Sequence, residues 1–206
     1  MTSSVSSISD KIRQQFDFGP YPRIPIDKSP KAESNTLFSH NLVTPYYLKH
    51  QRVINTERAT ILDAGCGSGY KSLVLAEANP GATIVGIDLS AESVSLAKTR
   101  LKHHGFDNAQ FHTLAIEDIP RLGMEFDYIN CDEVLYLFPN PADGLASLKS
   151  ALKPQGIIRS NLHSSWQRAP YFRAQNVFQM MGLFENNPEA LEVELVQEIM
   201  KALKPG

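Results

Sequence analysis

The sequence is poor in cysteine and has no long hydrophobic run. Its 206 residues include only two cysteines, Cys66 and Cys131, which are too few for a disulfide framework. No stretch approaches the roughly 18 consecutive apolar residues of a transmembrane helix. No N-terminal segment joins positive charge to an apolar run, as a signal peptide does. These absences predict a protein of the reducing cytoplasm that does not act in a membrane.

An excess of positive charge is also missing. The formal net charge is -2, whereas nucleic-acid binding requires a local surplus of lysine and arginine to contact phosphates. His103 and His104 lie with Lys98, Arg100 and Lys102 in a basic stretch, which we interpret as a solvated helix face. No cluster of His, Cys, Asp and Glu has the spacing of metal ligands. The sequence therefore predicts no nucleic-acid partner and no metal.

The residues that are present suit one globular domain. Hydrophobic residues make up 42% of the chain and charged residues 20%, which is typical of a globular protein of this length. We expect residues 1–15 to be disordered or loosely ordered and residues 16–206 to form a single domain. Within it we predict an N-terminal arm and helix over 16–56, a core over 57–162 and C-terminal helices over 163–206.

Proline dominates residues 17–35, a segment that we call the arm. Its prolines are Pro20, Pro22, Pro25 and Pro30. They exclude a helix, because proline lacks an N–H group and clashes with the preceding turn. Apolar side chains accompany them, so we predict a packed, extended arm rather than a free linker. Farther along, Thr44 before Pro45 predicts an N-cap and a helix that continues to about Ile54.

From residue 59 onward, short apolar runs alternate with segments of helical periodicity. The predicted strands are 60–63, 83–87, 110–114, 126–131 and 156–161. The predicted helices are 70–78, 90–104, 141–152, 164–182 and 189–203. Strands that alternate with helices indicate a parallel sheet with helices on both faces, that is, an α/β fold.

Glycines cluster directly after the first predicted strand. Gly65, Gly67 and Gly69 precede a helix, so that a ligand can approach the backbone and meet the N–H groups of the helix start. Asp63 stands just before the glycines. Asp88 ends the second predicted strand, where a carboxylate can accept both hydroxyls of a ribose. The pattern indicates a site for a nucleoside cofactor.

Two classes of cofactor compete for this layout. A dinucleotide site prefers G-x-G-x-x-G with a small third residue, but that third position is Tyr70. Asp63 would repel a pyrophosphate, whereas its charge suits the amino group or the sulfonium of S-adenosylmethionine. The residues therefore favour S-adenosylmethionine over NAD.

Five segments in chain order resemble the motifs of class I S-adenosylmethionine-dependent methyltransferases. They are Asp63–Gly69, Gly86–Ser90, Ala115–Pro120, Phe126–Cys131 and Leu152–Gly156. The resemblance implies a Rossmann-like sheet of five parallel strands in the order 3-2-1-4-5, with the cofactor held by the core over 57–162. The residues that it implies for cofactor binding are Asp63, Gly65, Cys66, Gly67, Gly69, Asp88, Leu89, Ile116, Glu117 and Cys131. We expect the two cysteines to flank the cofactor in a packing role.

A narrower resemblance concerns the arm. Gly19–Arg23 is similar to the NPYPRW arm of bacterial methyltransferases that are often fused to tetratricopeptide repeats, and Gly156–Ser164 is similar to a second segment of that group. The chain departs from the group at Ile24, where the group has tryptophan, and at His163, where it has tyrosine. The sequence contains no such repeat, and the group's substrates do not carry over.

Five residues are candidates for contact with a methyl acceptor: Tyr21, Arg23, Glu133, Tyr136 and His163. Tyr136 and His163 follow the fourth and fifth strands, where substrates approach such sheets, and each is either a proton acceptor or a rim residue. Glu133 either orients a substrate amine or begins a helix. The arm either closes over the cleft or only covers apolar surface. Because displacement at a sulfonium needs no fixed triad, the catalytic residues stay unassigned.

Class I methyltransferases usually add an antiparallel hairpin after the fifth strand, but two helices are predicted there instead. We therefore expect the sheet to lack this hairpin, and the chain to be truncated or the N-terminal part of a longer protein. The open edge of the fifth strand favours a homodimer or a missing C-terminal region. The predicted function is methyl transfer to a small-molecule or protein acceptor. The alternatives are a non-catalytic S-adenosylmethionine-binding module and, less favoured, an NAD-dependent oxidoreductase.

Overall fold

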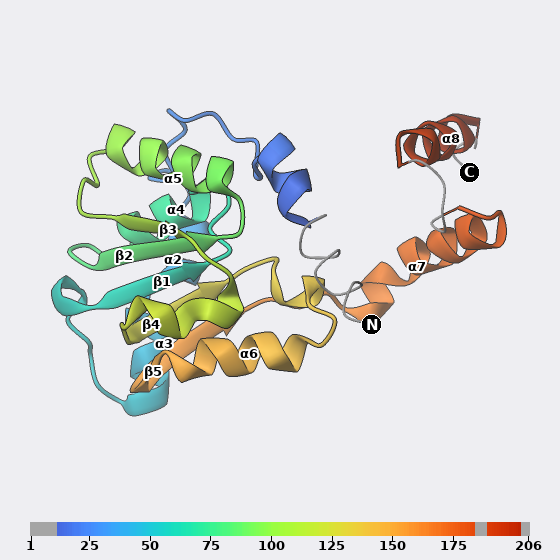
Figure 1. Cartoon of the computed structure of the whole chain (residues 1–206). Helices are drawn as coiled ribbons and strands as arrows, with labels where there is room; N and C mark the ends of the chain where they lie inside the picture. The colour runs from blue at the N-terminus through green and yellow to red at the C-terminus, as the bar shows by residue number, and fades with distance from the viewer. Residues whose placement is uncertain (1–11, 184–188, 203–206) are drawn as a thin grey trace. The chain divides into compact units, whose positions relative to one another are not determined.

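The computed structural model describes residues 12–183 and 189–202 and contains one parallel sheet (Figure 1). Its strands are β1 (Thr60–Ala64), β2 (Thr83–Asp88), β3 (Gln110–Thr113), β4 (Phe126–Cys131) and β5 (Leu152–Ser160). All neighbouring pairs are parallel, and the strand order is β3-β2-β1-β4-β5. The sheet order predicted from the sequence is confirmed. Within the described residues, no strand follows β5.

Helices cover both faces of this sheet. One face carries α2 (Ser34–His40), α3 (Val43–His50), α4 (Tyr70–Ala78) and α5 (Ala91–His103). The other carries α6 (Pro141–Ser150) and the 3₁₀ helices η2 (Ile116–Leu122) and η3 (Leu135–Leu137), and a further 3₁₀ helix, η1 (Thr56–Arg58), precedes β1. Ile61 and Leu62 are neighbours in β1 but belong to two separate apolar clusters, because successive side chains of a strand point to opposite faces.

The chain falls into two compact units, Met1–Leu162 and His163–Gly206. The first unit holds the sheet. The second contains α7 (Ser165–Met180) and α8 (Glu189–Ala202), close to the two helices predicted at the C-terminal end. None of the described helices is long and apolar enough to cross a membrane. The division into domains that we derived from the sequence stays a prediction.

The N-terminal segment contains more helix than we expected. Residues 12–18 are helical and thus enter the stretch for which we predicted little order, whereas residues 1–11 lie outside the described residues. Helix α2 was not predicted. Helix α3 begins at Val43, before the expected cap, because the Oδ1 atom of Asn41 accepts the N–H of Thr44 at 2.7 Å. It ends at His50 rather than near residue 54, since Gln51 adopts a left-handed conformation with φ of 54°.

Strand β5 begins at Leu152, four residues before the strand predicted at 156–161. The sequence there contains Pro154 and polar neighbours, which resemble a turn. In the structure an irregularity in the pairing with β4, between Phe126 and Tyr128, accommodates the proline. Proline is tolerated at bulges and in edge strands because no partner needs its missing N–H.

The start of α4 approaches α5 closely at Gly69. This glycine has φ of +81°, and a Cβ atom there would lie 2.6 Å from Cα of Ala97. We expect Gly69→Ala to lower the free energy of unfolding by about 2–5 kcal/mol in urea titrations, since left-handed strain adds to overpacking. Gly105→Ala is the matched control, because Gly105 has φ of +83° and no atom within 4 Å of such a Cβ. Equal losses in the two variants would contradict the role given to this close approach.

Candidate functional site

The glycine loop, Gly65–Gly69, connects the carboxyl end of β1 to the start of α4. The backbone N–H groups of Gly65 and Cys66 donate to the carbonyl oxygen of Ile87 at 2.8 and 2.9 Å. These bonds tie the loop to the end of β2. The carboxyl edge of the sheet is where ligands bind in open α/β folds, so the structure places the loop where a cofactor site is expected.

Asp88 joins the glycine loop to the start of α5. Its Oδ2 atom accepts the N–H of Gly67 at 2.9 Å, and its Oδ1 atom accepts the N–H of Ser90 at 2.9 Å. Burial raises the pKa of Asp88, the two backbone hydrogen bonds oppose this shift, and the nearby charge of Asp17 adds to it. Leu89, the next residue, is half-buried. The structure thus brings Asp88 together with the loop, as the spacing of the motif indicated.

Protein atoms lie against the backbone of two loop glycines. A Cβ atom on Gly65 would lie 2.3 Å from Cγ2 of Val134, and one on Gly67 would lie 2.1 Å from the carbonyl oxygen of Tyr21. We expected these glycines to admit a ligand. In the structure they admit the arm and the segment after β4, so the need for glycine is explained by contacts within the chain.

Asp63 is enclosed rather than open to the crevice. The residue is only 1% exposed. The Oδ2 atom accepts a hydrogen bond from Ser72 Oγ at 2.6 Å, and the Oδ1 atom accepts one from Asn130 Nδ2 at 2.9 Å. Burial raises the pKa of Asp63, while these two hydrogen bonds lower it. From the sequence we expected this carboxylate to bind the loop amides, the cofactor or both; in the structure it joins β1 to α4 and β4, and a contact with the cofactor stays a prediction.

A charged cluster that sequence analysis missed lies directly after β4. The Oδ2 atom of Asp132 lies 3.2 Å from Nε2 of His40 and 3.6 Å from Nζ of Lys71, and its Oδ1 atom pairs with the guanidinium of Arg159. The Asp132 side chain is 7% exposed. Burial opposes its charge, but hydrogen bonds from His40 and Arg159 outweigh burial and hold the pKa of Asp132 well below its usual range.

The charged cluster continues to Asp63. Arg159 donates from Nη1 to Oδ1 of Asn130 at 3.0 Å, and Asn130 in turn donates to Asp63. A chain of hydrogen bonds therefore runs from Asp132, directly after β4, to Asp63 in the central strand β1. Its members come from elements far apart in the sequence. The only local signal was a carboxylate, Asp132, immediately after an apolar strand.

The remaining residues implied for cofactor binding lie near the ends of β1, β3 and β4. Ile116 is buried and Glu117 exposed at the start of η2. Cys66 and Cys131 are free and buried, and their side chains belong to the clusters on opposite faces of the sheet. Burial raises the pKa of the Cys66 thiol, and it raises that of Cys131 to about 12. These thiols suit the packing role that we predicted.

Two of the acceptor candidates lie on the arm. Tyr21 and Arg23 have exposed side chains, and the carbonyl oxygen of Tyr21 accepts the N–H of Ser68 at 2.8 Å. The arm therefore contacts the glycine loop through its backbone.

The other three candidates follow β4 and β5. Glu133 has φ of 61°, and its N–H donates to Oδ1 of Asn161 at 2.6 Å. Tyr136 lies in η3 and is partly exposed. His163 belongs to the second unit, where its Nε2 atom lies 2.6 Å from Nη2 of Arg168. The structure brings Glu133 to the ends of β4 and β5, whereas the role of His163 stays a prediction.

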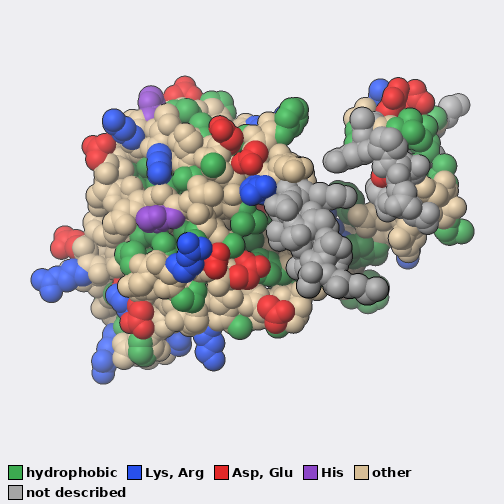
Figure 2. Space-filling model, viewed as in Figure 1, with side chains coloured by type: hydrophobic (Ala, Val, Ile, Leu, Met, Phe, Trp, Pro, Cys, Tyr) green, Lys and Arg blue, Asp and Glu red, His purple; other side chains and the backbone are tan. Residues whose placement is uncertain are grey.

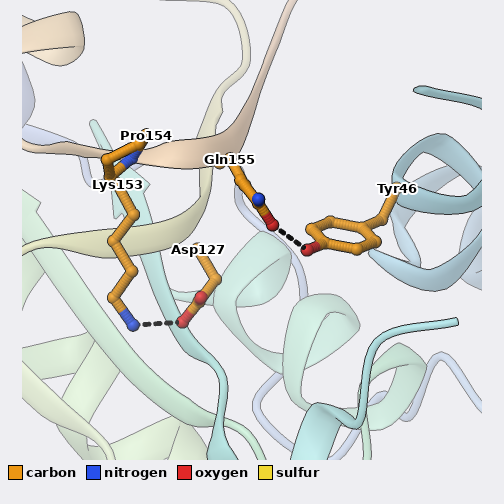
Figure 3. Close-up of a pocket in the computed structure, with 6 residues that line it drawn as sticks. Tyr46, Asp127, Lys153, Pro154 and Gln155 are labelled. Carbon is orange, nitrogen blue, oxygen red and sulfur yellow. Dashed lines mark hydrogen bonds and ion pairs between the residues drawn. The ribbon is translucent and has the colours of Figure 1, made fainter. Parts of the chain in front are cut away.

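A cavity of about 360 Å³ lies at the end of the sheet opposite the glycine loop (Figure 3). Its charged wall is the ion pair of Lys153 and Asp127, 2.7 Å between Nζ and Oδ2. On the other side, Tyr46 donates from its hydroxyl to Oε1 of Gln155 at 2.9 Å. These residues stand near the amino ends of β4 and β5, whereas the glycine loop follows a carboxyl end. The cavity is therefore separate from the candidate site.

The surface in view carries charges of both signs. Figure 2 shows lysine and arginine side chains scattered among acidic and apolar ones on this face of the sheet-containing unit. Within residues 12–183 and 189–202, no group of three or more His, Cys, Asp and Glu side chains could hold a metal ion.

Known proteins resemble this chain in sequence and in fold. A family described as a methyltransferase domain matches residues 55–205. An uncharacterized protein of Synechococcus is 32% identical over 85% of this chain and 42% of its own length. The ubiquinone biosynthesis O-methyltransferase of Actinobacillus pleuropneumoniae is 34% identical over 48% of this chain and 43% of its own length. The structure of PKMT2 from Rickettsia typhi in complex with AdoHcy is 24% identical, with a TM-score of 0.57, over 90% of this chain and 35% of that one.

The chain spans less than half the length of each of these three proteins. The likeness to the solved structure shows the fold alone, but the family match extends over residues 55–205, well beyond half of the chain. The same residues form the sheet, the glycine loop and the Asp88 contact described above. The chain is thus a member of the methyltransferase-domain family.

Proposed function

We propose that the chain binds S-adenosylmethionine at the glycine loop and transfers its methyl group to an acceptor by in-line displacement. The observation that carries this proposal is the loop bound to Asp88 at the carboxyl edge of the sheet, in a chain of the methyltransferase-domain family. When bound, S-adenosylmethionine supplies an electrophilic methyl group on a sulfonium. The similar fold of PKMT2 holds AdoHcy, the product that such a transfer leaves.

The described residues fit such a ligand. Each carboxylate oxygen of Asp88 accepts one backbone N–H and keeps a lone pair for a ribose hydroxyl. The Oδ1 atom of Asp17 is buried and has no hydrogen-bond partner among the described residues. Because the charge of Asp17 acts on Asp88, this spare acceptor belongs to the same region. A ligand rich in O–H and N–H donors would satisfy both carboxylates.

The chain's own residues would orient and support the reactants. Asp88 would hold the ribose, while Ile116 and Glu117 would border the adenine. We propose an indirect role for Asp63, which accepts hydrogen bonds from Ser72 and Asn130 and so joins β1 to β4 and to α4, the helix that follows the loop. Alignment of nucleophile, methyl carbon and sulfur can lower the barrier by up to about 7–11 kcal/mol. A base is needed only when the acceptor atom carries a proton at neutral pH, which that base or water must then accept.

The proposed acceptor is a small molecule or a protein. The relatives' substrates do not define it, since this chain spans only 43% of the ubiquinone biosynthesis O-methyltransferase. Turnover of S-adenosylmethionine should be measured against panels of metabolites and of proteins. Tight cofactor binding without turnover of any acceptor would instead favour the non-catalytic binding module.

Calorimetry should distinguish the two cofactor classes. We expect saturable binding of S-adenosylmethionine and S-adenosylhomocysteine. NAD should show no binding up to about 1 mM, which corresponds to a binding free energy weaker than about -4 kcal/mol. Tyr70 is the reason, because it occupies the position of the third glycine and its hydroxyl donates to Oε1 of Glu33 at 2.7 Å. Preferential binding of NAD, or no binding of either adenosyl ligand, would contradict the proposal.

A further inference from the structure

We infer that Arg100 is a positioning residue for cofactor binding, because it clamps the arm onto the glycine loop. The inference rests on the proposed function, since it assumes that the loop holds the cofactor. Arg100 lies on α5. The sequence led us to place it on a solvated basic face, which is wrong, because the structure buries its side chain.

Arg100 uses every nitrogen of its guanidinium to hold backbone carbonyls. Nε donates to the carbonyl oxygen of Ser68 at 2.9 Å. Nη1 and Nη2 donate to the carbonyl oxygens of Pro25 and Ile24, each at 2.7 Å. One side chain thus joins the glycine loop to two consecutive residues of the arm.

Ser68 completes the contact from the side of the loop. Its N–H donates to the carbonyl oxygen of Tyr21 at 2.8 Å, and its hydroxyl donates to that of Pro22 at 2.7 Å. With the bond from Arg100, all polar groups of this buried loop residue are bound. The arm therefore contributes to the conformation of the loop at the residue between Gly67 and Gly69.

The arm depends on these partners as much as the loop does. Its prolines prevent a regular helix or strand, so donors from other elements add to the few bonds that the arm's own N–H groups make, such as those to the carbonyl oxygens of Pro22 and Pro25. Arg100 and Ser68 supply four of these donors, and His104 on α5 lies 2.8 Å from the carbonyl oxygen of Ile26. Docking of the arm and the shape of the loop are therefore two aspects of one arrangement.

Burial of the charged Arg100 side chain carries a free-energy penalty, and the three carbonyl bonds offset it. The side chain is fully buried and pairs with no acidic side chain among the described residues. Burial lowers the pKa of the Arg100 guanidinium. A hydrophobic residue could fill the same space without the penalty of a buried charge, but it could not hold three carbonyl groups at once.

The affinity test compares Arg100→Met with Lys98→Met. Both variants remove a positive charge from α5, but Lys98 is exposed. We expect Arg100→Met to bind S-adenosylhomocysteine about 10- to 100-fold more weakly than the wild type, within the usual range of coupling between sites, and Lys98→Met to bind normally. Arg100→Lys should restore part of the affinity, because an ammonium can donate to some of the carbonyls. Circular dichroism should verify that each variant is folded.

A second measurement tests the clamp without relying on a folded Arg100 variant. Arg23 is exposed, but the carbonyl oxygen of the next residue, Ile24, is held by Arg100, so we expect trypsin to cleave after Arg23 when the arm leaves the loop. Coupling between sites is reciprocal. S-adenosylhomocysteine should therefore slow this cleavage in the wild type, by roughly 10- to 100-fold at saturation, when cleavage follows the open population. Ser68→Ala, which removes a single bond to the arm, should accelerate cleavage in the absence of ligand, because cleavage follows the open population. Ligand binding should weaken only in proportion to the loss of the closed population.

The outcomes separate this inference from the proposed function. If the wild type does not bind S-adenosylhomocysteine, the proposed function fails. If the wild type binds but the ligand leaves cleavage after Arg23 unchanged, the inference is overturned while the proposed function stands. Folded Arg100→Met that binds the ligand within about twofold of the wild type, against the fivefold or more typical of coupled sites, would overturn it as well.

Discussion

Asp88→Ala should lower the affinity for S-adenosylhomocysteine by at least about 100-fold, because a hydrogen bond to a charged group contributes about 1.5–3 kcal/mol and a ribose offers two hydroxyls. The fold should persist. Burial raises the pKa of Asp88, so its ionised form is less favourable in the folded protein than in the unfolded chain. That destabilisation sets in as the pH rises from about 3.9, the usual carboxyl value, through the raised pKa. The substitution therefore removes no net stabilising charge.

Titration calorimetry measures this loss, and Asp88→Asn serves as the matched variant. Asparagine retains one acceptor oxygen for the backbone, so it should keep the N–H of either Gly67 or Ser90 bonded while losing the charge. We expect an affinity between those of the wild type and the alanine variant. If Asp88→Ala remained folded and bound the ligand within about tenfold of the wild type, less than the loss of one such bond, the ribose assignment would be wrong.

Asp132→Ala should lower the free energy of unfolding by about 1.5–3 kcal/mol at neutral pH, since it removes a buried carboxylate that accepts hydrogen bonds from a charged donor. Three basic side chains, His40, Lys71 and Arg159, meet at this carboxylate. Asp118→Ala provides the control, because Asp118 pairs with Arg121 at 3.5 Å on the surface. An exposed pair contributes less than about 1 kcal/mol. Similar losses in both variants would contradict the role of the charged cluster.

The effect of Asp132 should depend on pH. Its pKa is held below its usual range, so its stabilisation is complete above about pH 4, the value for an unfolded aspartate. It is lost as the pH falls toward the lower pKa of the folded state. The difference in unfolding free energy between the wild type and Asp132→Ala should thus shrink below about pH 4. A difference that stays constant during acidification would show that the charge of Asp132 is not the source of its effect.

The order of the strands could be predicted because it follows from local patterns and from the family resemblance. Five apolar runs alternate with helices, and only a few sheet topologies are compatible with such a pattern of buried parallel strands. The start of β5 could not be predicted in the same way. Lys153 to Gly156 contain a proline and polar residues, and only the irregular pairing with β4 and the position at the sheet edge make a strand possible there.

The glycine loop and Asp88 were also accessible from the sequence, because their contact follows from the adjacency of β1 and β2. The environment of Asp63 was not accessible from the sequence. Whether a carboxylate at the end of β1 faces a ligand or the interior depends on Ser72 and Asn130, and Asn130 lies 67 positions farther along the chain. A motif specifies residue types at short spacing but not which distant side chains will surround them.

For this protein, short-range patterns in the chain were enough to indicate the α/β sheet, the glycine loop and the class of cofactor. Tertiary contacts alone decided that Arg100 holds an arm 75 positions away and that Asp132 gathers basic side chains from α2, α4 and β5. The physical reason is that secondary structure and turns depend on near neighbours. A hydrogen bond between distant elements exists only where folding brings a donor and an acceptor within about 3 Å of each other.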